Sequence, residues 1–200
     1  MKKILIATKN PDKFREIHHL LAELSYDFVS LIDFPDIEGA EETGLTLLEN
    51  STIKALDAYR KTGIPAVADD TGLSVFALQG MPGVFSARFA GKNATYRDNR
   101  LKLLNLMDGV TDRRASFVTV VTFVIDESRI FHFIGEVEGF ITTEERGNMG
   151  FGYDSIFLYP QLGKTFAEIP LEHKNKISHR ARAFSLFRRF LMTYESNFPG

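Results

Sequence analysis

The feature that most constrains the fold is an alternation of short apolar segments with segments of helical periodicity near the start of the chain. Residues 4–7 form a short apolar run, and the segment after it carries apolar residues at helical spacing, namely Phe14, Ile17, Leu21 and Leu24. Asn10 suits the N-cap of that helix and Pro11 its first position. A second apolar run at 28–31 completes a strand–helix–strand opening, which is typical of α/β proteins.

The next part of the chain predicts one helix, one strand and one loop. Thr46 and Glu49 have the spacing of a capping box, which predicts a helix that runs to about residue 61. The apolar residues at 65–68 predict a short strand. Glycines and a proline within 79–91 predict a loop.

The remaining segments add two helices and a long hairpin. A helix is expected at 95–107, with an apolar face formed by Leu101, Leu104 and Met107. Segments 117–125 and 129–140 flank a short polar turn and predict two long paired strands. A strand at 155–159 precedes a last helix that begins near Ser178 and faces inward with Phe184, Phe187, Leu191 and Tyr194. We therefore expect an α/β fold with a mixed central β-sheet, flanking helices and a long β-hairpin.

Composition excludes several classes of protein. The 200 residues include no cysteine, which excludes disulfides, zinc–thiolate sites, iron–sulfur clusters and thiol nucleophiles. The formal net charge of −2 disfavours a protein that coats nucleic acid or a membrane surface. The N-terminal apolar run is too short for a secretory signal, and no stretch approaches the roughly 20 apolar residues of a membrane span. We expect a cytoplasmic protein whose 18 phenylalanines mainly fill the core.

The charges are nevertheless segregated along the chain. Residues 33–50 contain six acids and neither lysine nor arginine, whereas residues 173–189 contain six lysines and arginines and no acid. Each stretch alone is consistent with a solvated surface. Together they suggest a site that binds both a metal ion and an anion.

The first candidate site is the segment with Thr8, Asn10 and Lys13, between a strand end and a helix start. Free backbone N–H groups and the positive end of a helix favour anions there, and Lys13 adds a full charge. The alternative is an ordinary N-cap followed by a surface lysine.

The second candidate is Asp69-Asp70-Thr71-Gly72, at the end of an apolar strand. Two carboxylates that leave a buried strand are costly to desolvate unless a cation meets them, and Mg²⁺ prefers such oxygen ligands. Neighbouring side chains of a strand point to opposite faces, so one of the two acids is expected to face a cleft. The alternative is an Asx-turn.

The last candidates are the glycine-rich segment 147–154 and Ser178-His179-Arg180. Phe151 between two glycines, with Asp154 nearby, can present a ring and a polar group to a flat heterocycle. The alternatives are a loop phenylalanine folded onto the core and a histidine at the surface. The histidines have no metal-ligand spacing, and the chain has no G-x-S-x-G, Walker A or kinase glycine-loop sequence.

Taken in order, these segments resemble the inosine/xanthosine triphosphate pyrophosphatase family, which removes non-standard purine nucleotides. The resemblance spans about residues 4–192 and rests on seven segments: Thr8-Lys9-Asn10-Pro11-Asp12-Lys13, Glu41-Glu42-Thr43-Gly44, Glu49-Asn50-x-x-x-Lys54-Ala55, Ala68-Asp69-Asp70-Thr71-Gly72-Leu73, Pro82-Gly83-Val84-Phe85-Ser86-Ala87-Arg88-Phe89-Ala90-Gly91, Phe151-Gly152-Tyr153-Asp154 and Ser178-His179-Arg180. The chain departs from the family pattern at Lys9 (often glycine), Ser51 (alanine) and Ser155 (proline). None of these changes removes a charged group that the chemistry needs.

The resemblance implies an ITPase-like fold with a cleft between two lobes and one nucleotide pyrophosphatase domain over residues 1–200. It implies Mg²⁺-dependent hydrolysis of ITP, dITP and XTP to the monophosphate and pyrophosphate by a homodimer that binds neither nucleic acid nor membrane. Asp70 matches the general base, and Glu41 with Asp70 the metal ligands. The substrate-binding positions are Thr8, Lys9, Asn10, Pro11, Asp12, Lys13, Lys54, Thr71, Phe151, Gly152, Tyr153, Asp154, Lys174, His179 and Arg180.

Two other functions are alternatives to this one. A related Maf-like pyrophosphatase would prefer modified pyrimidine triphosphates. A non-enzymatic nucleotide or nucleic-acid binder would use the basic stretch at 173–189, but it leaves Glu41 and Asp70 unexplained because carboxylates repel phosphate unless a metal intervenes.

Overall fold

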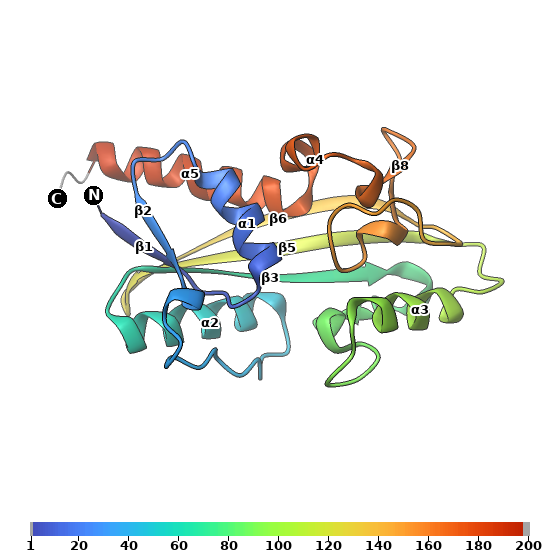
Figure 1. The fold of residues 1–200 in the computed structure, drawn as a ribbon, viewed down its shortest axis with the longest axis horizontal. Helices are drawn as coiled ribbons and strands as arrows, with labels where there is room; N and C mark the ends of the chain where they lie inside the picture. Colours follow the sequence, from blue (N-terminus) through green and yellow to red (C-terminus); the bar gives the residue numbers. More distant parts are fainter. Residues whose placement is uncertain (1, 198–200) are drawn as a thin grey trace. The chain divides into compact units, whose positions relative to one another are not determined.

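The computed structural model describes residues 2–197, whose internal contacts divide the chain into two compact units (Figure 1). Unit 1 comprises Met1–Asp70, Thr119–Gly135 and Arg180–Gly200. Unit 2 comprises Thr71–Val118 and Glu136–His179. Among the described residues, no helix has the length and apolar character that a membrane crossing requires.

Unit 1 begins with the predicted strand–helix–strand motif. Strand β1 (Lys3–Ile6) pairs in parallel with β2 (Asp27–Ser30), and helix α1 (Pro11–Leu21) connects the two. On its other side β1 pairs in parallel with β3 (Ala66–Val75), where Leu5 lies opposite Ala66. Asn10 caps α1, as predicted, because the Asn10 side chain accepts hydrogen bonds from the amides of Asp12 and Lys13. Pro11 is the first residue of the helix, also as predicted.

Helices cover both faces of the unit 1 strands. Ile4 and Ile6 pack with α1 and with α5 (His179–Asn197), whereas Leu5 and Ala7 pack with α2 (Leu47–Thr62) on the opposite face. Figure 1 shows α5 and α2 on either side of these strands. This alternation follows from the pleat of a strand, which sends successive side chains to opposite faces. The predicted capping box of α2, Thr46 with Glu49, is present.

Unit 2 contains antiparallel strand pairs, although residues 119–135 of the sheet belong to unit 1. From β3 the strand order of the sheet continues as β3–β5–β6–β7–β8, and β4 (Pro82–Gly83) pairs antiparallel with the second half of β3. Strands β5 (Arg114–Asp126) and β6 (Arg129–Ile141) are neighbours joined through Glu127 and Ser128, so the long hairpin is confirmed. Antiparallel pairing continues from β6 to β7 (Phe157–Tyr159) and on to β8 (Lys164–Thr165). With the parallel pairs of unit 1, these pairs confirm the mixed sheet.

Helices and short turns complete unit 2. Leu103 and Met107, in and just after α3 (Tyr96–Leu106), are buried in a cluster around Phe157 and Phe166. Helix α4 (Leu171–Ile177) follows β8. The 3₁₀ turns of the chain are Leu31–Asp33, Phe76–Leu78, Ser86–Arg88, Asp154–Ile156 and Phe166–Glu168.

Four predictions about local structure were wrong in detail. The strand predicted at 65–68 continues to Val75, and the loop predicted at 79–91 contains β4 and a 3₁₀ turn. The first residues of the strand predicted at 155–159 form a 3₁₀ turn, Asp154–Ile156, in which the Ile156 amide donates to the Tyr153 carbonyl. Met107 is buried and Leu104 packs against the same cluster, as predicted, but Leu101 is exposed and Leu103 is the buried leucine of α3.

The predicted core residues of the last helix are largely confirmed. Phe184, Phe187 and Leu191 are buried in the cluster of α5, and Tyr194 is half-buried. Phenylalanine does fill the core, because the four largest fully buried side chains are Phe157, Phe166, Phe184 and Phe187.

Candidate active site

The loop between β1 and α1 is held by its own polar side chains. The Thr8 hydroxyl accepts the Asn10 amide at 3.1 Å, and Oδ1 of Asn10 accepts the amides of Asp12 and Lys13 at 2.9 and 3.2 Å. Ser30, at the end of β2, donates its hydroxyl to the Thr8 carbonyl. The amides of Asp12 and Lys13 are therefore already engaged by Asn10.

Asp69 belongs to a cluster of four charged side chains in unit 1. The Lys13 ammonium lies 3.3 Å from Oδ1 of Asp69, and the Arg180 guanidinium lies 3.1 Å from Oδ2. Arg180 also forms an ion pair with Glu16 of α1. Burial opposes the charged carboxylate, but Lys13 and Arg180 outweigh it and hold the pKa of Asp69 well below its usual range. The acid next to the predicted base is thus a buried, ionised counter-ion.

Asp70 of β3 belongs to a second group, formed with Lys54 of helix α2 and with Glu42. The Lys54 ammonium lies 2.6 Å from Oδ1 of Asp70 and 3.2 Å from Oε1 of Glu42. Burial raises the pKa of Asp70, although Lys54 opposes the shift. The two neighbouring acids of β3 have different cationic partners, as the alternation of a strand predicts.

The carboxylates around Lys54 fit a hard divalent cation. Asp70 and Glu42 both place an oxygen atom within 3.2 Å of the Lys54 ammonium, so their charge is compatible with a bound cation. Among the described residues, no three His, Cys, Asp or Glu side chains gather as a metal-binding group. Magnesium commonly uses one or two carboxylates and completes its shell with water and substrate phosphates. Glu41, the predicted second ligand, is exposed.

In unit 2, Asp154 organises the glycine-rich loop. Its Oδ2 accepts the Lys174 ammonium at 2.6 Å and the Phe151 amide at 3.0 Å. Lys174 is buried, and its ammonium lies 5.3 Å from the centre of the Phe151 ring. Lys174 and Asp154, both predicted to bind substrate, thus form an ion pair with each other. The hydroxyl of Tyr153 donates to the Ser86 carbonyl, and burial raises the pKa of Tyr153.

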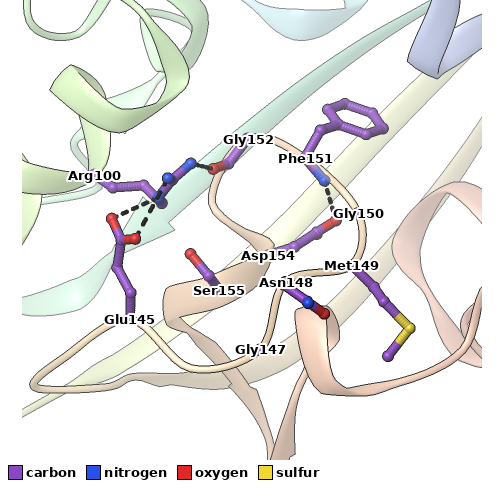
Figure 2. Close-up of a pocket in the computed structure, with 10 residues that line it drawn as sticks. All are labelled: Arg100, Glu145, Gly147, Asn148, Met149, Gly150, Phe151, Gly152, Asp154 and Ser155. Carbon is purple, nitrogen blue, oxygen red and sulfur yellow. Dashed lines mark hydrogen bonds and ion pairs between the residues drawn. The ribbon is translucent and has the colours of Figure 1, made fainter.

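The same loop lines a cavity of about 250 Å³ (Figure 2). Arg100 and Glu145 border the cavity, and the loop glycines form its wall. Gly150 has a φ of +74°, and a Cβ there would lie 2.1 Å from Oδ2 of Asp154. Glycine is required at this position both for the left-handed backbone and for the close approach of the carboxylate.

His179 is an aromatic core residue in unit 2. Its ring is buried and stacks on Phe117, with centres 4.4 Å apart and an interplanar angle of 14°, and it lies 6.1 Å from Phe166. Thr71, also predicted to bind substrate, follows Asp70 in β3. Lys9 is exposed in the loop before α1, and Pro11 is exposed at the first position of that helix.

Sequence reasoning missed four residues of these groups. Glu16 lies three positions after Lys13 on α1, and that helical spacing is the signal that places both on one face. Glu42 was quoted only as the neighbour of Glu41. Tyr96 and Arg100, four positions apart on α3, contact the glycine-rich loop, and no local pattern marks that contact.

Comparison with known proteins extends over nearly the whole chain. The family model described as the Ham1 family matches residues 4–190. The dITP/XTP pyrophosphatase of Photorhabdus laumondii is 45% identical over 190 residues, which are 93% of this chain and 96% of the relative. That of Geobacter sulfurreducens is 44% identical over 193 residues, covering 96% of this chain and 97% of the relative.

Solved structures agree with this result. A HAM1 protein from Coxiella burnetii has a TM-score of 0.89 at 41% identity, covering 96% of this chain and 100% of its own. A nucleoside-triphosphatase (dITP/XTP pyrophosphatase) from Mycobacterium abscessus has a TM-score of 0.75 at 38% identity, covering 92% of this chain and 98% of its own. With the family model matched from residue 4 to residue 190, the chain belongs to the Ham1 family.

Proposed function

We propose that this protein hydrolyses the non-standard purine nucleoside triphosphates dITP, ITP and XTP to the monophosphate and pyrophosphate. The observation that carries the proposal is membership of the Ham1 family, together with relatives named dITP/XTP pyrophosphatase that match more than nine-tenths of the chain. Asp70 beside Lys54 supplies a carboxylate and a cation of the kind that this reaction needs.

Asp70 is the proposed general base. A carboxylate within hydrogen-bond reach of a water molecule can take its proton as the water attacks the α-phosphorus, which is typically worth about 10²–10⁴-fold in rate. The bond between the α-phosphorus and the bridging oxygen then breaks, and pyrophosphate leaves. Lys54 and Lys13 are the proposed phosphate ligands. Lys54 forms an ion pair with Asp70, and Lys13 forms one with the neighbouring residue Asp69.

Mg²⁺ is the proposed cofactor, with Glu41 and Asp70 as its ligands. When bound, it would neutralise phosphate charge and polarise the α-phosphoryl group. The position of Asp70 beside Lys54 supports Asp70 as a ligand, and Glu42 is the second carboxylate that contacts Lys54. The exposed position of Glu41 leaves its carboxylate accessible to an incoming metal–nucleotide complex.

The nucleoside is proposed to bind Thr71, the loop residues Phe151, Gly152, Tyr153 and Asp154, and His179, Arg180 and Lys174. Hypoxanthine and xanthine carry a 6-oxo acceptor where adenine carries an amino group. Backbone amides and Arg180 are the proposed donors to that oxygen. An adenine amino group that faces a donor leaves a buried group unpaired, at a cost of about 1–3 kcal/mol.

We further propose that residues 1–200 act as a single pyrophosphatase domain, as a homodimer in the cytoplasm. The match of one family model from residue 4 to residue 190 supports the single domain, because it includes segments of both compact units. The homodimer and the compartment follow from the family resemblance.

A substrate panel tests the proposed function. The purified protein is incubated with dITP, XTP, ATP, GTP or a 5-methylated UTP, with Mg²⁺ or with EDTA, and pyrophosphate and orthophosphate are measured separately. We expect pyrophosphate from dITP and XTP, little from the others, and none with EDTA. Equal rates with ATP, or orthophosphate as the sole product, would overturn the proposal, and preference for the methylated UTP would indicate a Maf-like activity.

A variant pair locates the chemistry. Asp70→Asn should abolish pyrophosphate release while the circular dichroism spectrum and the unfolding midpoint stay near those of the wild type. Asp36→Asn, at an exposed turn, is the matched control and should retain full activity. An active Asp70→Asn protein would remove Asp70 from the role of base.

A further inference from the structure

Arg100 makes an unusual set of contacts for a residue on a surface helix. Its Nη1 donates to the Gly152 carbonyl at 2.8 Å, and its Nε donates to Oε1 of Glu145 at 2.9 Å. Figure 2 shows the guanidinium lying between the carbonyl and the carboxylate. The Arg100 side chain is only 16% exposed. A planar guanidinium can meet both acceptors at once, whereas a lysine ammonium lacks that fixed fork.

The loop that Arg100 contacts needs such a restraint. Gly147, Gly150 and Gly152 all have positive φ values, between +61° and +80°. Glycine is free to adopt many other backbone conformations, so holding three of them in the left-handed region costs conformational entropy. The contacts that hold the loop in place therefore decide how often it has its binding conformation.

Other contacts hold different parts of the loop. The Arg146 amide donates to the Ser155 carbonyl, and the Met149 amide donates to the Ala167 carbonyl. These two bonds hold the segment on either side of Gly147. Within the loop, the Phe151 amide donates to Asp154. Arg100 adds a restraint at Gly152, from a helix about 50 residues earlier in the chain.

Helix α3 makes a second contact with the same loop. The ring of Tyr96 lies 5.8 Å from the ring of Phe151. Tyr96 and Arg100 are four positions apart, so they lie on the same face of α3. The start of this helix is fixed by the Thr95–Asp98 capping box. One helix face thus contacts the two adjacent loop residues, Phe151 and Gly152.

We infer that Arg100 is a positioning residue for nucleoside binding: with Glu145 as its counter-ion, it holds Gly152 and thereby sets the backbone that presents Phe151 to the base. This inference rests on the proposed function, since it assumes that the loop binds the nucleoside. It assigns Arg100 no contact with the reacting phosphates. Its loss should therefore weaken substrate binding without changing the chemical step.

Kinetics test this assignment with three variants. For Arg100→Met we expect KM for dITP to rise about 10-fold to 100-fold, the usual range for losing a charge-assisted hydrogen bond, with kcat within about twofold of the wild type. Arg100→Lys keeps the positive charge but loses the planar guanidinium that meets two acceptors at once. Its KM should therefore lie between that of the wild type and that of Arg100→Met. Arg97→Met, on an exposed position of the same helix, should match the wild type in both constants.

Amide hydrogen exchange provides a readout that does not depend on activity. The Phe151 amide, protected by Asp154, should exchange faster in Arg100→Met, and the β5 and β6 amides should not change. Wild-type exchange in the loop, or a wild-type KM, would overturn the inference, as would a fall in kcat and in the folded fraction together. If the wild-type protein releases no pyrophosphate, the proposed function fails, and the exchange experiment separately decides whether Arg100 orders the loop.

Discussion

The ammonium of Lys54 lies 2.6 Å from Oδ1 of Asp70, and the same ammonium lies 3.2 Å from Glu42. Helix α2 thus delivers a cation to the acid that is expected to remove a proton from water. The ion pair supplies a counter-charge for the Asp70 carboxylate, and Lys54 is the proposed ligand for the substrate phosphates.

Replacing Lys54 should weaken catalysis more than folding. Lys54→Gln removes a charge-assisted hydrogen bond worth about 1.5–3 kcal/mol, so we expect kcat/KM for dITP to fall roughly 10-fold to 100-fold. The control is Lys61→Gln, on the same helix, where the lysine pairs with Asp57 in a partly exposed position. Steady-state pyrophosphate release measures both variants. Similar kcat/KM values for the two would contradict the role of Lys54.

Replacing Gly150 should weaken substrate binding because of a steric clash as well as its backbone conformation. An alanine Cβ there would lie 2.1 Å from the Asp154 carboxylate, which would have to move away from Lys174 and from the Phe151 amide. We expect Gly150→Ala to raise KM for dITP by about tenfold or more. Gly163 has a similar φ of +61° and open space around it, so Gly163→Ala incurs the backbone strain alone, about 1–2 kcal/mol, and should keep its KM.

The aromatic cluster of unit 1 should contribute strongly to stability. Phe187 is fully buried, with ring centres of Phe123 and Phe133 at 5.0 and 5.6 Å. Phe187→Ala should lower the free energy of unfolding by about 3–5 kcal/mol, as measured by urea denaturation. Its neighbour Leu186 is 44% exposed, and Leu186→Ala should change that free energy by less than about 1 kcal/mol. A small effect of Phe187→Ala would mean that this cluster is loosely packed.

The start of α3 should respond to acid. The hydroxyl and amide of Thr95 donate to Asp98 and lower its pKa, so the folded state releases this proton more readily than the unfolded state, where the pKa is about 3.9. The resulting stability is present above that value and is lost as the pH falls through the lower folded-state pKa. Asp98→Asn should show a shallower loss of stability below about pH 4 than the wild type. Parallel curves for the two proteins would contradict this account.

Local features of the sequence were sufficient to predict most elements. The caps of α1 and α2, and the long hairpin, were predicted because each depends on residues within a few positions of one another. The predictions were least accurate where local patterns were ambiguous. Leu101 and Leu103 are both leucines on α3, and only packing against the unit 2 core decides that Leu103 is the buried one.

The candidate site was predicted less completely than the fold. Asp70 and Asp154 were identified from local patterns, and Lys54 and Lys174 from the family resemblance, but the pairing of these residues was not predicted. Glu16 was missed altogether, because a single acid on an amphipathic helix has no local mark of burial. Its role follows only from its ion pair with Arg180, 164 positions away.

The sequence by itself determined the type and order of most of the longer elements, the chemistry of the charged residues and the family, since these depend on local propensity, capping and residue identity. Tertiary structure alone decided which charges meet. Asp69 and Arg180 are 111 positions apart, yet burial makes each the counter-ion of the other. An unpaired charge is costly in a low-dielectric interior, and the fold supplies its partner from wherever the chain passes.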